Sequence, residues 1–180
     1  MLSLIIILVL VYGTYVGVRR GLMMQLFYTI GYGISFGLAV LGYRSFGPHL
    51  NLIIPYPSAL PKNYFAFFSK KAGLGLDTAF YFGVAFLIIL FVGWMITRFI
   101  GVYFHNLTYY PMNARVNDIG GGILAFICNY IGIFVIIYVL ALIPVDSLQH
   151  MLNNSFMTNM MVHYSIGLTD LFTNLLINIV

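Results

Sequence analysis

Four long stretches of this chain contain no charged side chain, and this feature limits what the chain can fold into more than any other. The stretches are residues 2–18, 21–43, 78–97 and 119–143. Each is close to the roughly 20 apolar residues that an α-helix needs to cross the hydrocarbon core of a bilayer. Only 7% of the chain is charged, whereas a soluble domain carries roughly 25% charged residues. The sequence therefore predicts an all-α integral membrane protein with a bundle of four transmembrane helices.

Two basic residues mark the point where the first two stretches meet. Arg19 and Arg20 end the first stretch, and the second begins at once with Gly21. Two spans joined by so short a link are expected to form an antiparallel hairpin, with both arginines at the membrane surface at its tip. Basic residues in short loops favour the cytoplasm, which predicts a cytoplasmic tip and an external N-terminus. The first stretch lacks the basic start and the clear cleavage site of a signal peptide, so we expect it to be retained as a helix.

The remaining segments divide into a loop and a tail. Residues 44–77 contain four of the six prolines, three lysines and several aromatic residues, which predicts an extramembrane loop with an interfacial stretch. We interpret residues 1–143 as a membrane domain and residues 144–180 as an amphipathic C-terminal helical tail. Apolar side chains recur in this tail at helical spacing, from Leu168 to Ile179. The tail can lie on the membrane surface, pack against the bundle or form a fifth span, and its Asn and Thr residues speak against spanning.

Small residues recur four positions apart within the spans. In lipid no hydrophobic force drives helices together, so close backbone contact over small residues takes that role. Each span carries candidates for such helix-packing positions: Gly13, Gly17, Gly33, Gly37, Gly93, Gly121 and Ala125. The alternative at each position is a glycine that simply faces lipid.

A few polar side chains border or interrupt the spans. Asn129 lies inside the fourth span, where it either hydrogen-bonds across helices or lines a path. Asn117 and Asp118 precede that span, and they suit either capping of its N-terminus or the binding of a partner or ion. Arg19 and Arg20 suit either a role in topology or the binding of anionic lipid headgroups.

No group of residues in the sequence has the spacing of a catalytic or metal site. The four histidines are far apart, and none has metal-ligand spacing with another. No nucleophile elbow is present, and the glycines at 120–122 open a span rather than a phosphate-binding loop. We therefore predict no catalytic residue, no cofactor and no metal, and a protein that is not an enzyme. The basic residues are scattered and several flank apolar stretches, which favours the lipid bilayer and its anionic headgroups over nucleic acid as partners.

Three short motifs resemble the CvpA family, the colicin V production proteins of bacterial inner membranes. The first is the Gly-Val-Arg-Arg-Gly sequence at residues 17–21, which is similar to the family's glycine–arginine hairpin. The second is Asn-Asp-Ile-Gly-Gly at residues 117–121, similar to the family's Asn-Arg-x-x-Gly entry into the last span, with Ala125 where a second glycine is usual. The third is a proline after the last span, Pro144, followed by an amphipathic tail that contains Ser155.

The resemblance implies a four-helix, multi-pass protein of the bacterial inner membrane. It also implies a role in bacteriocin production or secretion and in envelope homeostasis, through membrane protein partners or a homo-oligomer. The chain departs from the family at Ser3, where Asp is frequent, and at Asp118, where Arg is frequent. An alternative function, a small oligomeric transporter or channel for an ion or small solute, rests on Asn129 and on the glycine-lined helix faces.

Overall fold

The computed structural model describes residues 1–56, 65–67 and 76–177 of the chain, and every regular element in these residues is a helix. Four helices are long and apolar enough to cross a membrane. They are α1 (Leu2–Arg20), α2 (Leu22–Leu50), α4 (Leu76–Tyr103) and α5 (Ala114–Ala141). The short helix η1 (His105–Tyr109) joins α4 to α5, and three short helices follow α5: α6 (Asp146–Asn153), α7 (Phe156–Tyr164) and α8 (Ile166–Leu176). The predicted fold class, an all-α membrane bundle of four spans, is confirmed.

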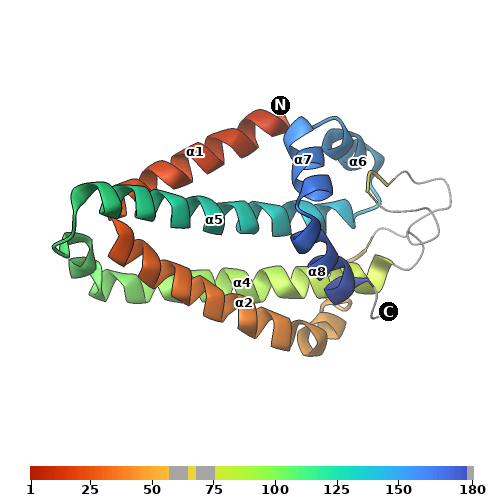
Figure 1. Ribbon diagram of the computed structural model, residues 1–180. Coiled ribbons are helices and arrows are strands. Elements are labelled where there is room, and N and C mark those ends of the chain that lie inside the picture. Colours follow the sequence, from red (N-terminus) through yellow and green to blue (C-terminus); the bar gives the residue numbers. More distant parts are fainter. Residues whose placement is uncertain (57–64, 68–75, 178–180) are drawn as a thin grey trace.

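The first two helices reverse direction at Gly21 but do not pack along one another. They diverge from this turn, and α5 lies between them while α4 runs beside α2 (Figure 1). Gly21 has a φ of 79°, in the left-handed region that favours glycine. The side-chain oxygen of Asn117 on α5 accepts the Leu22 N–H at 2.8 Å. The hairpin expected from the sequence is therefore an open one, with α5 placed between its two arms.

The helices extend further than the uncharged stretches. The second helix continues to Leu50 and includes Pro48, so the residues from 44 to 50 that were expected in the loop are helical. A proline removes one backbone hydrogen bond, but packing compensates at this end: Leu50 is buried, and Gly47 lies directly against Phe82 of α4. The third span was expected to end at Thr97 and the fourth to begin at Ile119. In the structure α4 continues to Tyr103 and α5 begins at Ala114, so both helices include charged residues close to the membrane surface.

Only part of the predicted 44–77 loop lies among the described residues. Phe65 is buried in the apolar core, and the Ala66 N–H donates to the side chain of Gln149 at 2.9 Å. Tyr56 donates to the carbonyl of Leu142 at 3.0 Å. Burial and the nearby Asp77 raise the pKa of Tyr56 to about 12, so its hydroxyl remains a donor at physiological pH. These described parts of the loop pack onto the end of the bundle rather than lying apart from it.

The tail consists of three short helices packed against the bundle, where the sequence indicated one amphipathic helix. Phe172 and Leu176 of α8 are fully buried. Tyr138 of α5 hydrogen-bonds Thr173 at 2.9 Å, and Tyr43 of α2 donates to the carbonyl of Leu175 at 2.8 Å. Phe172 also meets four aromatic rings of the long helices, at centroid distances of 5.3 to 6.2 Å: Phe36, Phe86, Phe134 and Tyr138. Of the three arrangements left open by the sequence, the structure shows packing against the bundle.

Candidate functional site

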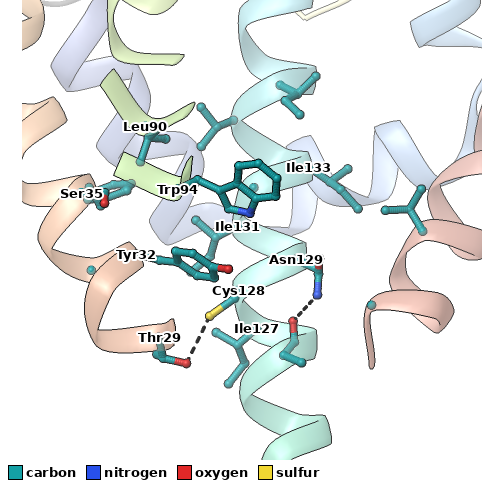
Figure 2. A pocket seen from close by; sticks show the side chains of 18 of the residues that line it. Thr29, Tyr32, Ser35, Leu90, Trp94, Ile127, Cys128, Asn129, Ile131 and Ile133 are labelled. Carbon is teal, nitrogen blue, oxygen red and sulfur yellow. Dashed lines mark hydrogen bonds between the residues drawn. The ribbon is translucent and has the colours of Figure 1, made fainter. Parts of the chain in front are cut away.

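A cavity of about 880 Å³ lies between α1, α2, α4, α5 and α8, and part of its lining is shown in Figure 2. Most of the lining is apolar. Several lining side chains are exposed rather than enclosed, including Tyr12 at 68%, Trp94 at 42% and Ile136 at 49%. All three lie within helices of membrane-spanning length and hydropathy. The cavity therefore opens sideways, toward the lipid that surrounds these helices.

Two arginines line the same end of this cavity. The guanidinium carbon of Arg20, in the last turn of α1, lies 4.8 Å from the centre of the Tyr28 ring. The guanidinium carbon of Arg98 on α4 lies 5.1 Å from the same ring and 5.2 Å from the ring of Trp94. Cation–π contacts of this kind stabilise a cation only partly. No Asp or Glu is among the described residues that line the cavity, so the two positive charges have no acidic counterpart there.

Three polar atoms at this end are buried and have no hydrogen-bond partner among the described residues. They are the amide oxygen of Gln25, the hydroxyl of Tyr32 and the Nε of Arg98. The Tyr32 hydroxyl and the Arg98 side chain lie close to one another and interact, but neither of these two atoms has a partner in hydrogen-bonding geometry. Gln25 is only 2% exposed. An unpartnered buried polar group costs about 1–3 kcal/mol, and such groups in native proteins are few and call for an explanation such as a bound molecule. Two cations and these unpartnered atoms make this end of the cavity chemically complementary to a polar, anionic group.

Asn129 lies on the α5 wall of the cavity, among the groups shown in Figure 2. Its side-chain nitrogen donates to the carbonyl of Ala125 within α5, at 2.7 Å, and its amide packs against Gly13 of α1. Asn129 therefore contacts another helix by packing, and its side chain hydrogen-bonds within its own helix. On the other side of α5, Cys128 lies 3.5 Å from the hydroxyl of Thr29 on α2.

The small residues of α1 and α5 form a close contact between two helix backbones. A Cβ added to Gly17 would overlap the Cβ of Ala125 and come within 2.6 Å of the carbonyl oxygen of Gly121. A Cβ added to Gly121 would come within 2.6 Å of the carbonyl oxygen of Gly17. The structure thus brings Gly13, Gly17, Gly121 and Ala125 together along a single crossing of two backbones.

On α2 the structure departs from the expected packing positions. Gly33 and Gly37 have no atom within 4 Å of an added Cβ. The side of α2 that faces α4 is formed by Gly31, which lies against Thr97, and by Ser35, which lies against Gly93. Positions two residues apart point to nearly opposite sides of a helix, so contact through Gly31 and Ser35 turns Gly33 and Gly37 away. Gly33 instead lines the cavity.

The residues at the hairpin tip have different roles from one another. Arg19 is exposed, whereas Arg20 lines the cavity, so only Arg19 lies free at the surface as the sequence suggested for both. Asn117 belongs to α5 but caps the start of a different helix, α2. The start of α5 is capped by the side chain of Asn113, which accepts the N–H of Arg115. Asp118 is exposed. Capping of α5 was expected from Asn117 and Asp118, and α5 begins one turn earlier because Asn113 supplies the cap.

A second polar contact joins the start of α1 to the tail. The hydroxyls of Ser3 and Ser155 lie 2.9 Å apart, and Thr158 donates to the Ser155 hydroxyl at 2.9 Å. Ser3 was noted from the sequence only as a departure from the family, and Ser155 only as part of a motif. Their 152-residue separation in the chain gave no signal that they meet.

Sequence reasoning did not single out the residues at the charged end of the cavity, other than Arg20. Gln25 was identifiable as a lone amide within an apolar span, and Arg98 as a cation in the last turns of the third span. Nothing in the sequence showed that these residues and Arg20 face one cavity. Among the described residues, no cluster of three or more His, Cys, Asp or Glu side chains is placed to hold a metal ion.

Comparison with known proteins matches this architecture to one family. The model of the colicin V production protein family matches residues 2–165. A protein of Bacillus subtilis (strain 168), described as the uncharacterized transmembrane protein YshB, is 29% identical over 175 residues, which cover 97% of each chain. No solved structure matches. The match spans all four long helices and reaches the end of α7, so this multi-pass membrane protein belongs to the colicin V production (CvpA) family.

Proposed function

We propose that this chain is a non-enzymatic protein of the bacterial inner membrane that supports the production or secretion of colicin V-like bacteriocins and the homeostasis of the envelope. The family to which it belongs supports the biological setting. The relative from Bacillus subtilis, which is described as a transmembrane protein, supports a location in a bacterial membrane. The observation that carries a binding role is the cavity, in which Gln25, Tyr32 and Arg98 present buried polar atoms without a hydrogen-bond partner, beside the cation of Arg20.

The chemistry of the lining supports binding rather than catalysis. Its polar members are two arginines, two amides, hydroxyls, one thiol and one indole, and no His, Asp or Glu is among them. General acid–base catalysis near neutral pH draws most often on His, Asp or Glu. Arginine stays protonated and serves instead to hold anions.

The experiment is a deletion of the chromosomal copy, complemented by the wild-type chain or by Arg98→Gln. The readouts are secretion of a peptide bacteriocin and survival in a membrane-active detergent. We expect deletion to lower both, the wild-type chain to restore both, and Arg98→Gln at equal expression to restore neither. Arg115→Gln is the matched control, because Arg115 is exposed at the same end of the bundle and does not line the cavity. Normal secretion and survival in the deletion strain would refute the proposal.

A small oligomeric transporter is the second candidate, and the cavity also favours it. A transport path needs polar groups inside the bundle, and Asn129 and Thr29 supply them alongside the arginines. The decisive measurement is solute or ion flux in liposomes that contain the purified chain. Flux no greater than that of empty vesicles would remove this candidate.

A further inference from the structure

The cavity is amphipathic along its length. Its arginines and Gln25 lie where α1 ends and α2 begins, whereas Val9, Phe36 and the α8 residue Leu171 line its apolar end. Val9 precedes Arg20 by eleven residues, and Phe36 follows Gln25 by eleven. At 1.5 Å per residue each interval is about 16 Å long, about half of the roughly 30 Å hydrocarbon core. The cavity thus has the depth of one leaflet, with its charged end toward a membrane surface.

The charged end is complementary to an anionic group. Arg20 and Arg98 both lie close to the ring of Tyr28, so one group placed beside that ring is within reach of both guanidinium groups. Two cations this close repel one another, and no described acidic side chain of the cavity offsets the repulsion. Arg98 also has its Nε unused, and this is a donor that requires an acceptor. A phosphate oxygen meets these requirements.

The remaining unpartnered atoms call for a hydroxyl in addition to the phosphate. The amide oxygen of Gln25 is an acceptor and requires a donor, which a phosphodiester lacks. The Tyr32 hydroxyl can donate or accept. A headgroup that carries both a phosphate and free hydroxyls satisfies all three atoms, whereas a zwitterionic headgroup would add a positive charge beside two arginines.

We propose that this cavity binds one phospholipid with an anionic, hydroxyl-bearing headgroup. The headgroup lies between Arg20 and Arg98 and contacts Gln25, and one acyl chain lies along the apolar wall of the cavity. The lipid enters sideways from the surrounding leaflet, through the opening that exposes Tyr12 and Trp94. This inference rests on the binding role given above, and it adds the chemical class of the ligand.

The chain carries its own probe of this site. Trp94 is the only tryptophan, and it lines the cavity beside Arg98. The full-length chain is placed in nanodiscs of phosphatidylcholine that contain a small fraction of phosphatidylglycerol with a spin label on its acyl chain. Trp94 fluorescence is recorded, and spin-labelled phosphatidylcholine at the same fraction is the reference. We expect several-fold stronger quenching by the phosphatidylglycerol probe, reversed by unlabelled phosphatidylglycerol.

Two sets of variants test the charged end and the apolar wall of the cavity separately. Arg98→Gln and Arg20→Gln remove the cations of the site, whereas Arg19→Gln removes an exposed cation one position away from Arg20. Gly33→Leu fills the cavity at a position with open space, and Gly37→Leu adds the same side chain at an equally open position outside the cavity. We expect Arg98→Gln, Arg20→Gln and Gly33→Leu to lose the preference for phosphatidylglycerol. Arg19→Gln and Gly37→Leu are expected to keep it.

Several outcomes would overturn the proposal. One is equal quenching of the wild-type chain by both probes, and another is a preference that survives in both Arg20→Gln and Arg98→Gln. Displacement of the labelled lipid by inorganic phosphate or glycerol phosphate would assign the site to a free phosphate. If the Arg98 variant does not fold, as judged by helix content and elution volume, Gly33→Leu and Gly37→Leu decide the question. These assays use no cells, so their failure leaves the deletion experiment to test the biological role separately.

Discussion

At the residue scale, glycines of the same sequence pattern have very different surroundings. Gly17 lies against the backbone of Gly121, and an added side chain there has no room. Gly37 has nothing within 4 Å. We predict that Gly17→Ala lowers the free energy of unfolding by about 1–3 kcal/mol, the usual cost of overpacking. Gly37→Ala is expected to leave it unchanged or slightly raised, and denaturation by sodium dodecyl sulfate in mixed micelles measures both. Equal effects of the two variants would contradict the α1–α5 contact.

Asn117 is a residue for which the sequence suggested the right type of interaction and the wrong helix. Its side chain accepts the Leu22 N–H at the start of α2. We predict that Asn117→Ala costs about 1 kcal/mol, the typical value for a lost N-cap, while Asp118→Ala costs nothing measurable because Asp118 is exposed. Thermal unfolding followed by circular dichroism compares the two variants. A larger loss from Asp118→Ala would show that capping of α5 was the correct interpretation.

Arg98 illustrates a group whose cost to folding is explained by binding. Its Nε is buried and unpartnered. Replacing it with the apolar Arg98→Met removes the unsatisfied donor, so we predict an equal or higher free energy of unfolding in neutral detergent, by up to about 1–3 kcal/mol. Wild type is expected to gain stability when phosphatidylglycerol is added, as any ligand of the folded state stabilises it, and the variant is not. A large loss of stability in neutral detergent would mean that Arg98 has a structural partner.

At the scale of the element, α8 is the segment whose position the sequence left open. It buries Phe172 among four aromatic rings of the long helices. Phe172→Ala is predicted to cost about 3 kcal/mol, the low end for removal of a buried phenyl ring. Leu171→Ala is the control, since Leu171 is 39% exposed. Limited proteolysis of the tail should follow the same order. Equal resistance of both variants would mean that α8 is not docked.

The long helices could be predicted from the sequence because lipid imposes one requirement on all of them, a long apolar stretch. Their ends could not, because charged side chains such as Arg98 are tolerated within a helix near the membrane surface. The tail could be predicted as helical but not as three helices. Thr173 is one of the tail's polar residues, yet it faces the bundle, where the hydroxyl of Tyr138 is its hydrogen-bond partner.

The candidate site could be predicted only in fragments. Arg20 and Asn129 were recognised in the sequence, each with two possible roles: topology or binding of anionic lipid headgroups for Arg20, and a bond across helices or the lining of a path for Asn129. Their actual placement depends on α5 lying between α1 and α2, and on Arg98 approaching from 78 residues away in the chain. Which small residues pair two helices depends on the tertiary structure. In the sequence, Gly33 and Gly37 have the same four-residue spacing as Gly13 and Gly17, so spacing alone could not show which pair forms a helix contact.

At the scale of the whole molecule, the basic residues of the membrane bundle are concentrated at one end. The end of α1 and the start of α5 lie together there, and α4 ends beside them (Figure 1). These segments carry Arg19, Arg20, Arg98 and Arg115. The opposite end is covered by α6, α7 and α8. The cavity extends from the basic end along part of α5 as far as α8 and opens toward lipid, so the fold itself offers a place for a lipid molecule.

Native mass spectrometry of the chain, extracted from bacterial membranes in mild detergent without added lipid, is the direct test of whether the cavity holds an anionic phospholipid. We predict that wild type retains one anionic phospholipid per chain, and that Arg19→Gln retains it equally. Arg98→Gln and Gly33→Leu, at the same helix content, are predicted to emerge without it. Binding of an anionic phospholipid in the cavity is contradicted if wild type carries no lipid, or if all four proteins carry the same lipids in the same amounts.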